Sequence, residues 1–138
     1  IKIALLSCPS LYQTVSSIAD DVKIFEFDER FSKYKDFVKY DFNLGDEEEY
    51  LKEFSKTFDL IIIDPPFLSE DCLRKSFKIV DRIRKSSDSL IILNTGSIQR
   101  ELASALGLKE TNYHPQHKNN LANEFSSFAN FDLDKYLL

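Results

Sequence analysis

Short, nearly continuous apolar runs are the feature of this sequence that most constrains its fold. The clearest are residues 1–6, 58–63 and 90–93, and each is followed by polar or turn-forming residues. Such runs are typical of strands buried on both faces, as in parallel sheets covered by helices. Segments with helical spacing lie between the runs, and parallel strands need such segments as right-handed crossovers. The pattern therefore predicts an α/β fold.

The alternation of strands and helices continues along the chain. Strands are expected at 1–6, 22–27, 37–40, 58–63, 90–93, 108–113 and 125–131, and helical stretches at 11–18, 30–34, 47–54, 70–85 and 98–106. No helix separates the last two strands, so we expect one of them to run antiparallel at an edge of the sheet. The order predicts a doubly wound, mostly parallel, seven-stranded sheet of the Rossmann-like type. One domain spanning residues 1–138 is expected.

Composition narrows the classes of function. The net charge is −5, with 23 acidic and 18 basic residues, which disfavours a nucleic-acid partner. No apolar run reaches the ~18 residues of a membrane span. Cys8 and Cys72 lack metal-ligand spacing, so we expect reduced thiols, a cytoplasmic protein and no metal site. The chain contains no Met and begins inside an expected strand, so we expect further residues upstream.

The residues that follow the expected strands are the candidates for a binding site, because ligands bind at the carboxyl edge of such sheets. Asp28 closes the second strand, where a carboxylate can accept hydrogen bonds from the ribose of a nucleoside cofactor. Asp41 and Phe42 close the third strand, where an acidic–aromatic pair can bind and stack an adenine. The alternative for Asp28 and Asp41 is a helix N-cap or a turn carboxylate. Ser7, Cys8 and Pro9 follow the first strand.

The segment Asp64, Pro65, Pro66 and Phe67 follows the strongest expected strand. The two prolines fix φ and remove two N–H donors, which leaves a stiff loop that offers hydrogen-bond acceptors. Such a loop can hold an amino group through the carboxylate and a proline carbonyl, with Phe67 packed against the substrate. The alternative is a rigid strand-to-helix turn with a buried Phe67. The position of the segment after a central strand, where ligands bind in such sheets, favours the catalytic interpretation.

Asp-Pro-Pro-Phe after the fourth strand resembles the signature of amino-methyltransferases. A wider set of segments is similar to the eukaryotic elongation factor 1A lysine methyltransferase family, some members of which were first labelled N6-adenine-specific DNA methyltransferases. These segments are residues 10–13, 25–28, 30–31, 64–73, 95–96 and 120–125, together with His117.

The resemblance implies a class I fold that binds S-adenosyl-L-methionine and methylates a lysine ε-amine of the translation factor. By position it implies ribose binding by Asp28, adenine binding by Asp41 and Phe42, and a substrate contact by Asp64. Ser7, Cys8 and Pro9 would pass the methionine end of the cofactor, and Asn123 and Glu124 would line the acceptor channel. The alternative for Asn123 and Glu124 is an Asn-type turn over core residues.

The first loop departs from the glycine-rich loop of the general fold, since it reads Ser7-Cys8-Pro9-Ser10. The close family shares this substitution. The residues alone also allow two other functions. One is an N6-adenine methyltransferase acting on DNA or RNA, and the other is a methyltransferase-like binding module without activity. The acidic balance disfavours the first, and the intact Asp-Pro-Pro-Phe segment disfavours the second.

Overall fold

A computed structural model describes residues 1–114 and 124–136, which form a seven-stranded sheet with the order β3-β2-β1-β4-β5-β7-β6. The strands β1 to β5 run parallel to one another, and β7 is antiparallel to both of its neighbours, β5 and β6. The predicted doubly wound, mostly parallel sheet is confirmed. The strands are β1 (Lys2–Leu6), β2 (Asp21–Glu26), β3 (Phe37–Lys39), β4 (Leu60–Ile63), β5 (Leu90–Gly96), β6 (Lys109–Glu110) and β7 (Phe125–Ala129).

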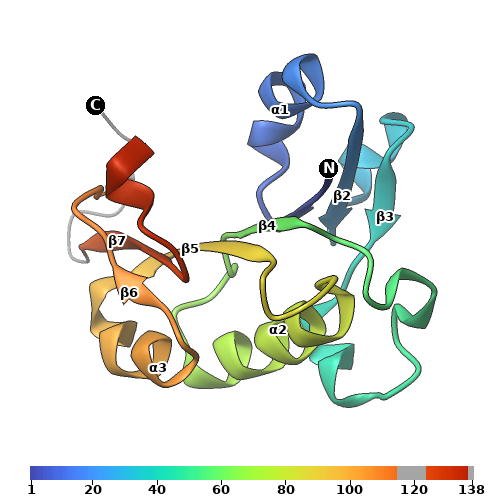
Figure 1. The fold of residues 1–138 in the computed structure, drawn as a ribbon. Coiled ribbons are helices and arrows are strands. Elements are labelled where there is room, and N and C mark those ends of the chain that lie inside the picture. The colour runs from blue at the N-terminus through green and yellow to red at the C-terminus, as the bar shows by residue number, and fades with distance from the viewer. Residues whose placement is uncertain (115–123, 137–138) are drawn as a thin grey trace.

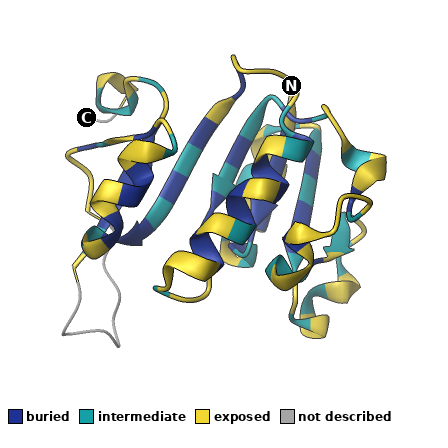
Figure 2. Cartoon of the chain, turned by 90° about the horizontal axis from the view of Figure 1, so that it is seen from below, coloured by how far each residue is buried: buried dark blue, intermediate teal, exposed yellow. Residues whose placement is uncertain are grey.

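Helices cover both faces of this sheet (Figure 1). α1 (Tyr12–Ile18) lies on one face, and α2 (Glu70–Ile83) and α3 (Arg100–Ala105) lie on the other. Buried residues alternate with more exposed ones along β4 and most of β5 (Figure 2). In β4, Ile61 and Ile63 belong to the large core on the α2 side, whereas Leu60 and Ile62 stay half-buried on the α1 side. In the described part of the chain, no helix is both long and apolar enough to cross a membrane.

α2 forms where the sequence predicts it. Ser69 caps the helix, because its hydroxyl accepts a hydrogen bond from the backbone N–H of Cys72 at 3.1 Å. Glu70 and Asp71 place negative charge in the first turn, where it interacts favourably with the helix dipole and stabilises the helix. An apolar stripe that includes Leu73 and Phe77 packs on the sheet.

The helix predicted at 47–54 is wrong. The segment contains turns and a short 3-10 helix, η4 (Lys52–Phe54), and Leu51 has a left-handed φ of 58°. The physical reason is a tertiary contact: the Arg82 guanidinium of α2 donates to the carbonyls of Tyr50 at 2.9 Å and Gly45 at 3.1 Å. A carbonyl bound by an arginine is less available to a helical turn, and these contacts hold the segment against α2.

The predicted position of the antiparallel strand is also wrong. β7 is the antiparallel strand, but it lies between β5 and β6, and β6 forms the edge of the sheet. The arrangement leaves the edge to a strand of two residues, Lys109–Glu110. A short edge strand limits pairing with other chains.

Candidate functional site

A pocket of about 410 Å³ lies where β2, β3 and β4 end. Five of the predicted site residues line it: Asp28, Asp41, Phe42, Pro66 and Phe67. They come from three strand ends that are far apart in the sequence, and the parallel sheet brings them to one edge. The remaining lining residues are Glu26, Phe27, Tyr40 and Asn43.

Phe42 and Phe67 form an aromatic wall of this pocket. Their ring centroids lie 6.0 Å apart with an interplanar angle of 66°, an edge-to-face arrangement. Phe67 is 61% exposed, so the alternative of a turn that buries Phe67 in the core does not apply. Two exposed or half-exposed rings beside acidic groups can hold a flat, polar-edged ligand.

Asp28 and Asp41 both cap short 3-10 helices at the rim of the pocket. Asp28 accepts from the Arg30 backbone N–H at 2.9 Å and pairs with its guanidinium at 2.6 Å. The side-chain and backbone hydrogen bonds from Arg30 lower the pKa of Asp28. Asp41 accepts from the Asn43 backbone N–H at 2.9 Å. The turn-carboxylate alternative therefore describes their local geometry, while both residues still line the pocket.

Glu26 is a pocket residue to which the sequence pattern assigned no role. It is the last residue of β2 and half-buried, and its carboxylate accepts from the Asp28 backbone N–H at 2.7 Å. Among the described residues, Glu26 forms no ion pair, whereas Asp28 is paired with Arg30. The signal was present in the sequence, because a carboxylate at the carboxyl end of an alternating strand lies at the edge where ligands bind.

The first loop passes beside this pocket with an unusual backbone. Ser7 has a φ of 60°, the left-handed region that favours glycine, and its N–H donates to the Phe25 carbonyl at 2.9 Å. Cys8 is 3% exposed and its thiol donates to the Ile62 carbonyl at 3.4 Å. Burial, followed by the charges of Asp64 and Glu26, raises the pKa of the Cys8 thiol. Within the described chain, Ser7, Cys8 and Pro9 do not line the pocket.

The left-handed Ser7 leads to a stability prediction. Ser7→Gly should raise the free energy of unfolding by up to about 1 kcal/mol, and Ser7→Val should lower it by about 1–2 kcal/mol. The reason is that a side chain in this region strains the backbone. Ser10, which has no positive φ, is the matched control, and Ser10→Gly should be destabilising. Urea unfolding measures all three, and equal effects of glycine at both positions would contradict the strain.

Asp64 stands at the start of the proline loop. Its backbone N–H donates to the Leu6 carbonyl at 3.1 Å, which fixes the loop to the end of β1. Its Oδ1 accepts from the Nδ2 of Asn94 in β5 at 2.8 Å. The carboxylate is therefore held at the junction of β4 and β5, beside the prolines that follow it along the chain.

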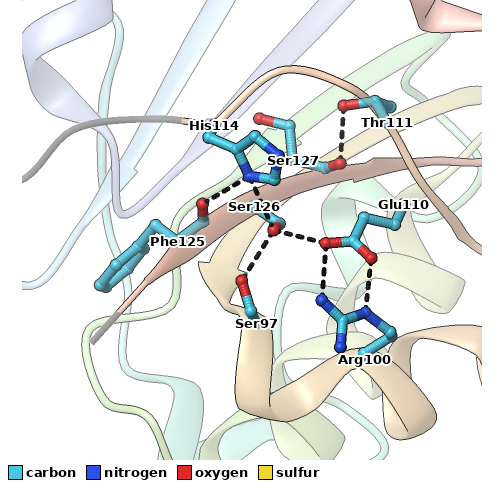
Figure 3. Close-up of polar contacts among 8 residues, drawn as sticks. All are labelled: Ser97, Arg100, Glu110, Thr111, His114, Phe125, Ser126 and Ser127. Carbon is cyan, nitrogen blue, oxygen red and sulfur yellow. Dashed lines mark hydrogen bonds and ion pairs between the residues drawn. The ribbon is translucent and has the colours of Figure 1, made fainter.

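Figure 3 shows a polar network on the far side of β5, centred on Ser126 of β7. The Ser126 hydroxyl contacts Ser97 at 2.8 Å, Glu110 at 2.6 Å and the His114 ring nitrogen at 3.2 Å. Glu110 also pairs with Arg100 at 2.5 Å. The network ties β6, β7 and the residues after β5 together at the carboxyl edge.

The Glu110 pair predicts how acid affects stability. Hydrogen bonds from Arg100 and Ser126 lower the pKa of Glu110 to about 2, from an ordinary 4.5. Its stabilisation is present above about pH 4.5 and is lost as the pH falls toward 2. Between pH 5 and pH 2, Glu110→Gln should lose about 1–2 kcal/mol less unfolding free energy than the wild type. Urea unfolding across this range tests this, with the exposed Glu101→Gln as control; parallel curves would contradict it.

Of the two predicted acceptor residues, Glu124 lies near this network. The Glu124 carbonyl accepts from the Ser97 N–H at 2.8 Å, so exposed Glu124 lies at the carboxyl end of β5. Asn123 lies outside the described residues. Among residues 1–114 and 124–136, no group of His, Cys, Asp and Glu side chains is suited to hold a metal ion.

The strand order, with β7 inserted antiparallel between β5 and β6, and a ligand-sized pocket at the carboxyl edge together define the class I methyltransferase fold. The solved structure of a ribosomal protein L11 methylase from Lactobacillus delbrueckii has this fold, with a TM-score of 0.52, 11% identity, and coverage of 92% of this chain and 68% of that one. HI0767 from Haemophilus influenzae gives a TM-score of 0.54 at 12% identity, with coverage of 95% and 88%.

The chain belongs to the family described as "Probable N6-adenine methyltransferase", whose model matches residues 1–133. It is 47% identical to the Drosophila melanogaster protein-lysine N-methyltransferase CG9154 over 99% of this chain. It is 40% identical to human EEF1A lysine methyltransferase 1 over 95% of this chain. The matches span 63% and 62% of those two relatives. The family resemblance inferred from the sequence is confirmed.

Proposed function

We propose that this chain is the catalytic core of an S-adenosyl-L-methionine-dependent protein-lysine N-methyltransferase that acts on translation elongation factor 1A. The observation that carries the proposal is the rigid Asp64–Phe67 segment at the carboxyl end of β4, beside a pocket of about 410 Å³. The names of the relatives supply the substrate. Two buried free thiols, Cys8 and Cys72, agree with a cytoplasmic protein.

The pocket fits a nucleoside cofactor in size and chemistry. Its volume falls in the range of small-molecule sites, which is roughly 300–1,000 Å³. Glu26 and Asp28 offer acceptors for ribose hydroxyls, Asp41 offers an acceptor for the adenine amine, and Phe42 offers an aromatic face. When bound, S-adenosyl-L-methionine supplies an electrophilic methyl group on a sulfonium.

The acceptor side follows from the proline loop. A lysine ε-ammonium, whose pKa in water is about 10.4, must first lose a proton, and a desolvated site favours the neutral form. The Asp64 carboxylate and the Pro65 carbonyl then accept the amine hydrogens, and Phe67 packs on the aliphatic stem. These contacts would aim the nitrogen lone pair at the methyl group that the bound cofactor supplies, and the surplus proton of the amine would leave to water. In-line positioning lowers the barrier by several kcal/mol.

The experiment supplies tritiated cofactor to the full-length protein together with translation elongation factor 1A, single-stranded DNA and duplex DNA at low salt. We expect label on the translation factor and none on DNA. An acidic chain of net charge −5 gains little from phosphate contacts, and an adenine in a duplex would have to be flipped out. Label on DNA without label on the translation factor would establish adenine methylation instead.

A further inference from the structure

A row of three polar side chains crosses the sheet next to the proline loop. Asp64 follows β4, Asn94 lies in β5 and Ser127 lies in β7. Parallel pairing of Ile63 with Leu93 places Asn94 beside Asp64, and antiparallel pairing places Asn94 opposite Ser127. The row therefore joins three strands at the carboxyl edge.

Hydrogen bonds orient the row in one direction. Asn94 donates from Nδ2 to the Asp64 Oδ1 at 2.8 Å, and the Ser127 hydroxyl donates to the Asn94 Oδ1. A carboxylate only accepts hydrogen bonds, so the amide nitrogen must face Asp64 and the amide oxygen must face Ser127. The carboxylate thus fixes which end of the amide it meets, and the Ser127 hydroxyl holds the amide oxygen on the other side.

The residues around the row indicate that its polar side chains are not there only to fill space between the strands. On the same sheet face, the preceding pair is apolar, Ile62 opposite Ile92, and Ile92 is paired with Ala129. Apolar side chains therefore pack on this face of the sheet two residues away from the row. Ser127 is only 1% exposed, and burying a hydroxyl costs free energy unless it is hydrogen-bonded. The polar residues occur where the row reaches Asp64.

We infer that Asn94 and Ser127 are positioning residues that hold the Asp64 carboxylate in the orientation that receives the acceptor amine. The inference deepens the proposed function and rests on it. Asn94 orients the carboxylate directly, and Ser127 acts through Asn94. Neither side chain needs to touch the acceptor or the cofactor.

A double-mutant cycle in the full-length protein tests the inference. Asn94→Ala should lower kcat about 10-fold, within the range for a hydrogen bond to a charged group, with the cofactor Kd changed less than about twofold. Asn94→Asp keeps the volume and removes the donor, so it should lower kcat at least as much. Asp64→Ala combined with Asn94→Ala should be no slower than Asp64→Ala alone, because the amide then has no carboxylate to hold.

The adjacent serine of β7 provides a matched control. Ser127→Ala should lower kcat about threefold to fivefold, since the amide loses the hydrogen bond that holds its oxygen but keeps its contact with Asp64. Ser126 is equally buried, but its hydroxyl faces the Glu110 network on the opposite side of the sheet. Ser126→Ala should therefore reduce stability and leave kcat within about twofold. Urea unfolding corrects every rate for the folded fraction.

A second readout needs neither substrate nor cofactor. In nuclear magnetic resonance spectra, the side-chain amide signals of Asn94 should shift in Asp64→Ala and again in Ser127→Ala, and they should not shift in Ser126→Ala. An Asn94 amide signal that does not shift in Asp64→Ala would overturn the inference. A loss of kcat in the double variant equal to the product of the two single losses would also overturn it. A wild type that methylates no protein while showing the predicted amide shifts would refute the proposed function and leave the hydrogen-bonded row standing.

Discussion

Asp64→Ala is expected to lower kcat for methylation of the translation factor about 10- to 100-fold, with the cofactor Kd changed less than about threefold. The range corresponds to one charge-assisted hydrogen bond, about 1.5–3 kcal/mol. The carboxylate sits at the end of β4, held by Asn94 at 2.8 Å, and does not line the nucleoside-sized pocket among the described residues. Its loss should therefore act on the acceptor rather than on the cofactor.

Single-turnover rates and calorimetry with S-adenosylhomocysteine separate these two effects. Asp88→Ala, which removes an exposed carboxylate before β5, controls for the change in net charge and should behave as the wild type. Should Asp64→Ala weaken the cofactor as strongly as it slows turnover, Asp64 would belong to the cofactor site and not to the acceptor site.

Glu26→Ala is expected to weaken S-adenosylhomocysteine binding about 10- to 100-fold, and Asp28→Ala only severalfold. Both carboxylates line the pocket, but Asp28 is already paired with the Arg30 guanidinium at 2.6 Å. A carboxylate engaged by arginine has fewer acceptor sites to offer a ribose. Glu26 accepts a hydrogen bond from the Asp28 backbone N–H and keeps more acceptor sites for a ribose than Asp28 does.

Calorimetry on each variant measures the difference, and Glu26→Gln separates charge from shape. Because Glu26 also accepts from the Asp28 backbone N–H, a loop displacement could mimic a lost ribose contact. Glu26→Gln retains an acceptor for that N–H and should recover part of the affinity. A larger loss for Asp28→Ala than for Glu26→Ala would return the ribose role to Asp28, as the sequence first suggested.

Buried parallel strands could be predicted from the sequence because a strand buried on both faces consists of consecutive apolar residues. In β4, Ile61 and Ile63 face the large core, and Leu60 and Ile62, which alternate with them, face the other helix layer, so the run is apolar throughout. The strand ends follow from the same runs, and this is why Asp28, Asp41 and Phe67 could be placed together in advance.

What the sequence could not predict depends on contacts between distant segments. The expected helix at 47–54 has helical spacing, but Arg82 binds the Tyr50 carbonyl from another element, and no local pattern records that bond. Asn94 and Ser127 likewise look like ordinary polar strand residues. Their role becomes visible only once the register of β5 and β7 is known, because a shift of one residue would turn Ser127 to the opposite face.

The position of β7 has a consequence for synthesis of the chain on the ribosome. β6 leaves the ribosome before β7, yet in the described structure it joins the sheet only through β7, which occupies the place beside β5. Until residues 125–129 emerge, β5 presents an unpaired edge, and such edges are exposed to wrong partners. The Ser127 hydroxyl arrives with this same strand. Completion of the sheet and the hydrogen bond that holds the Asn94 amide oxygen are therefore one event, late in translation.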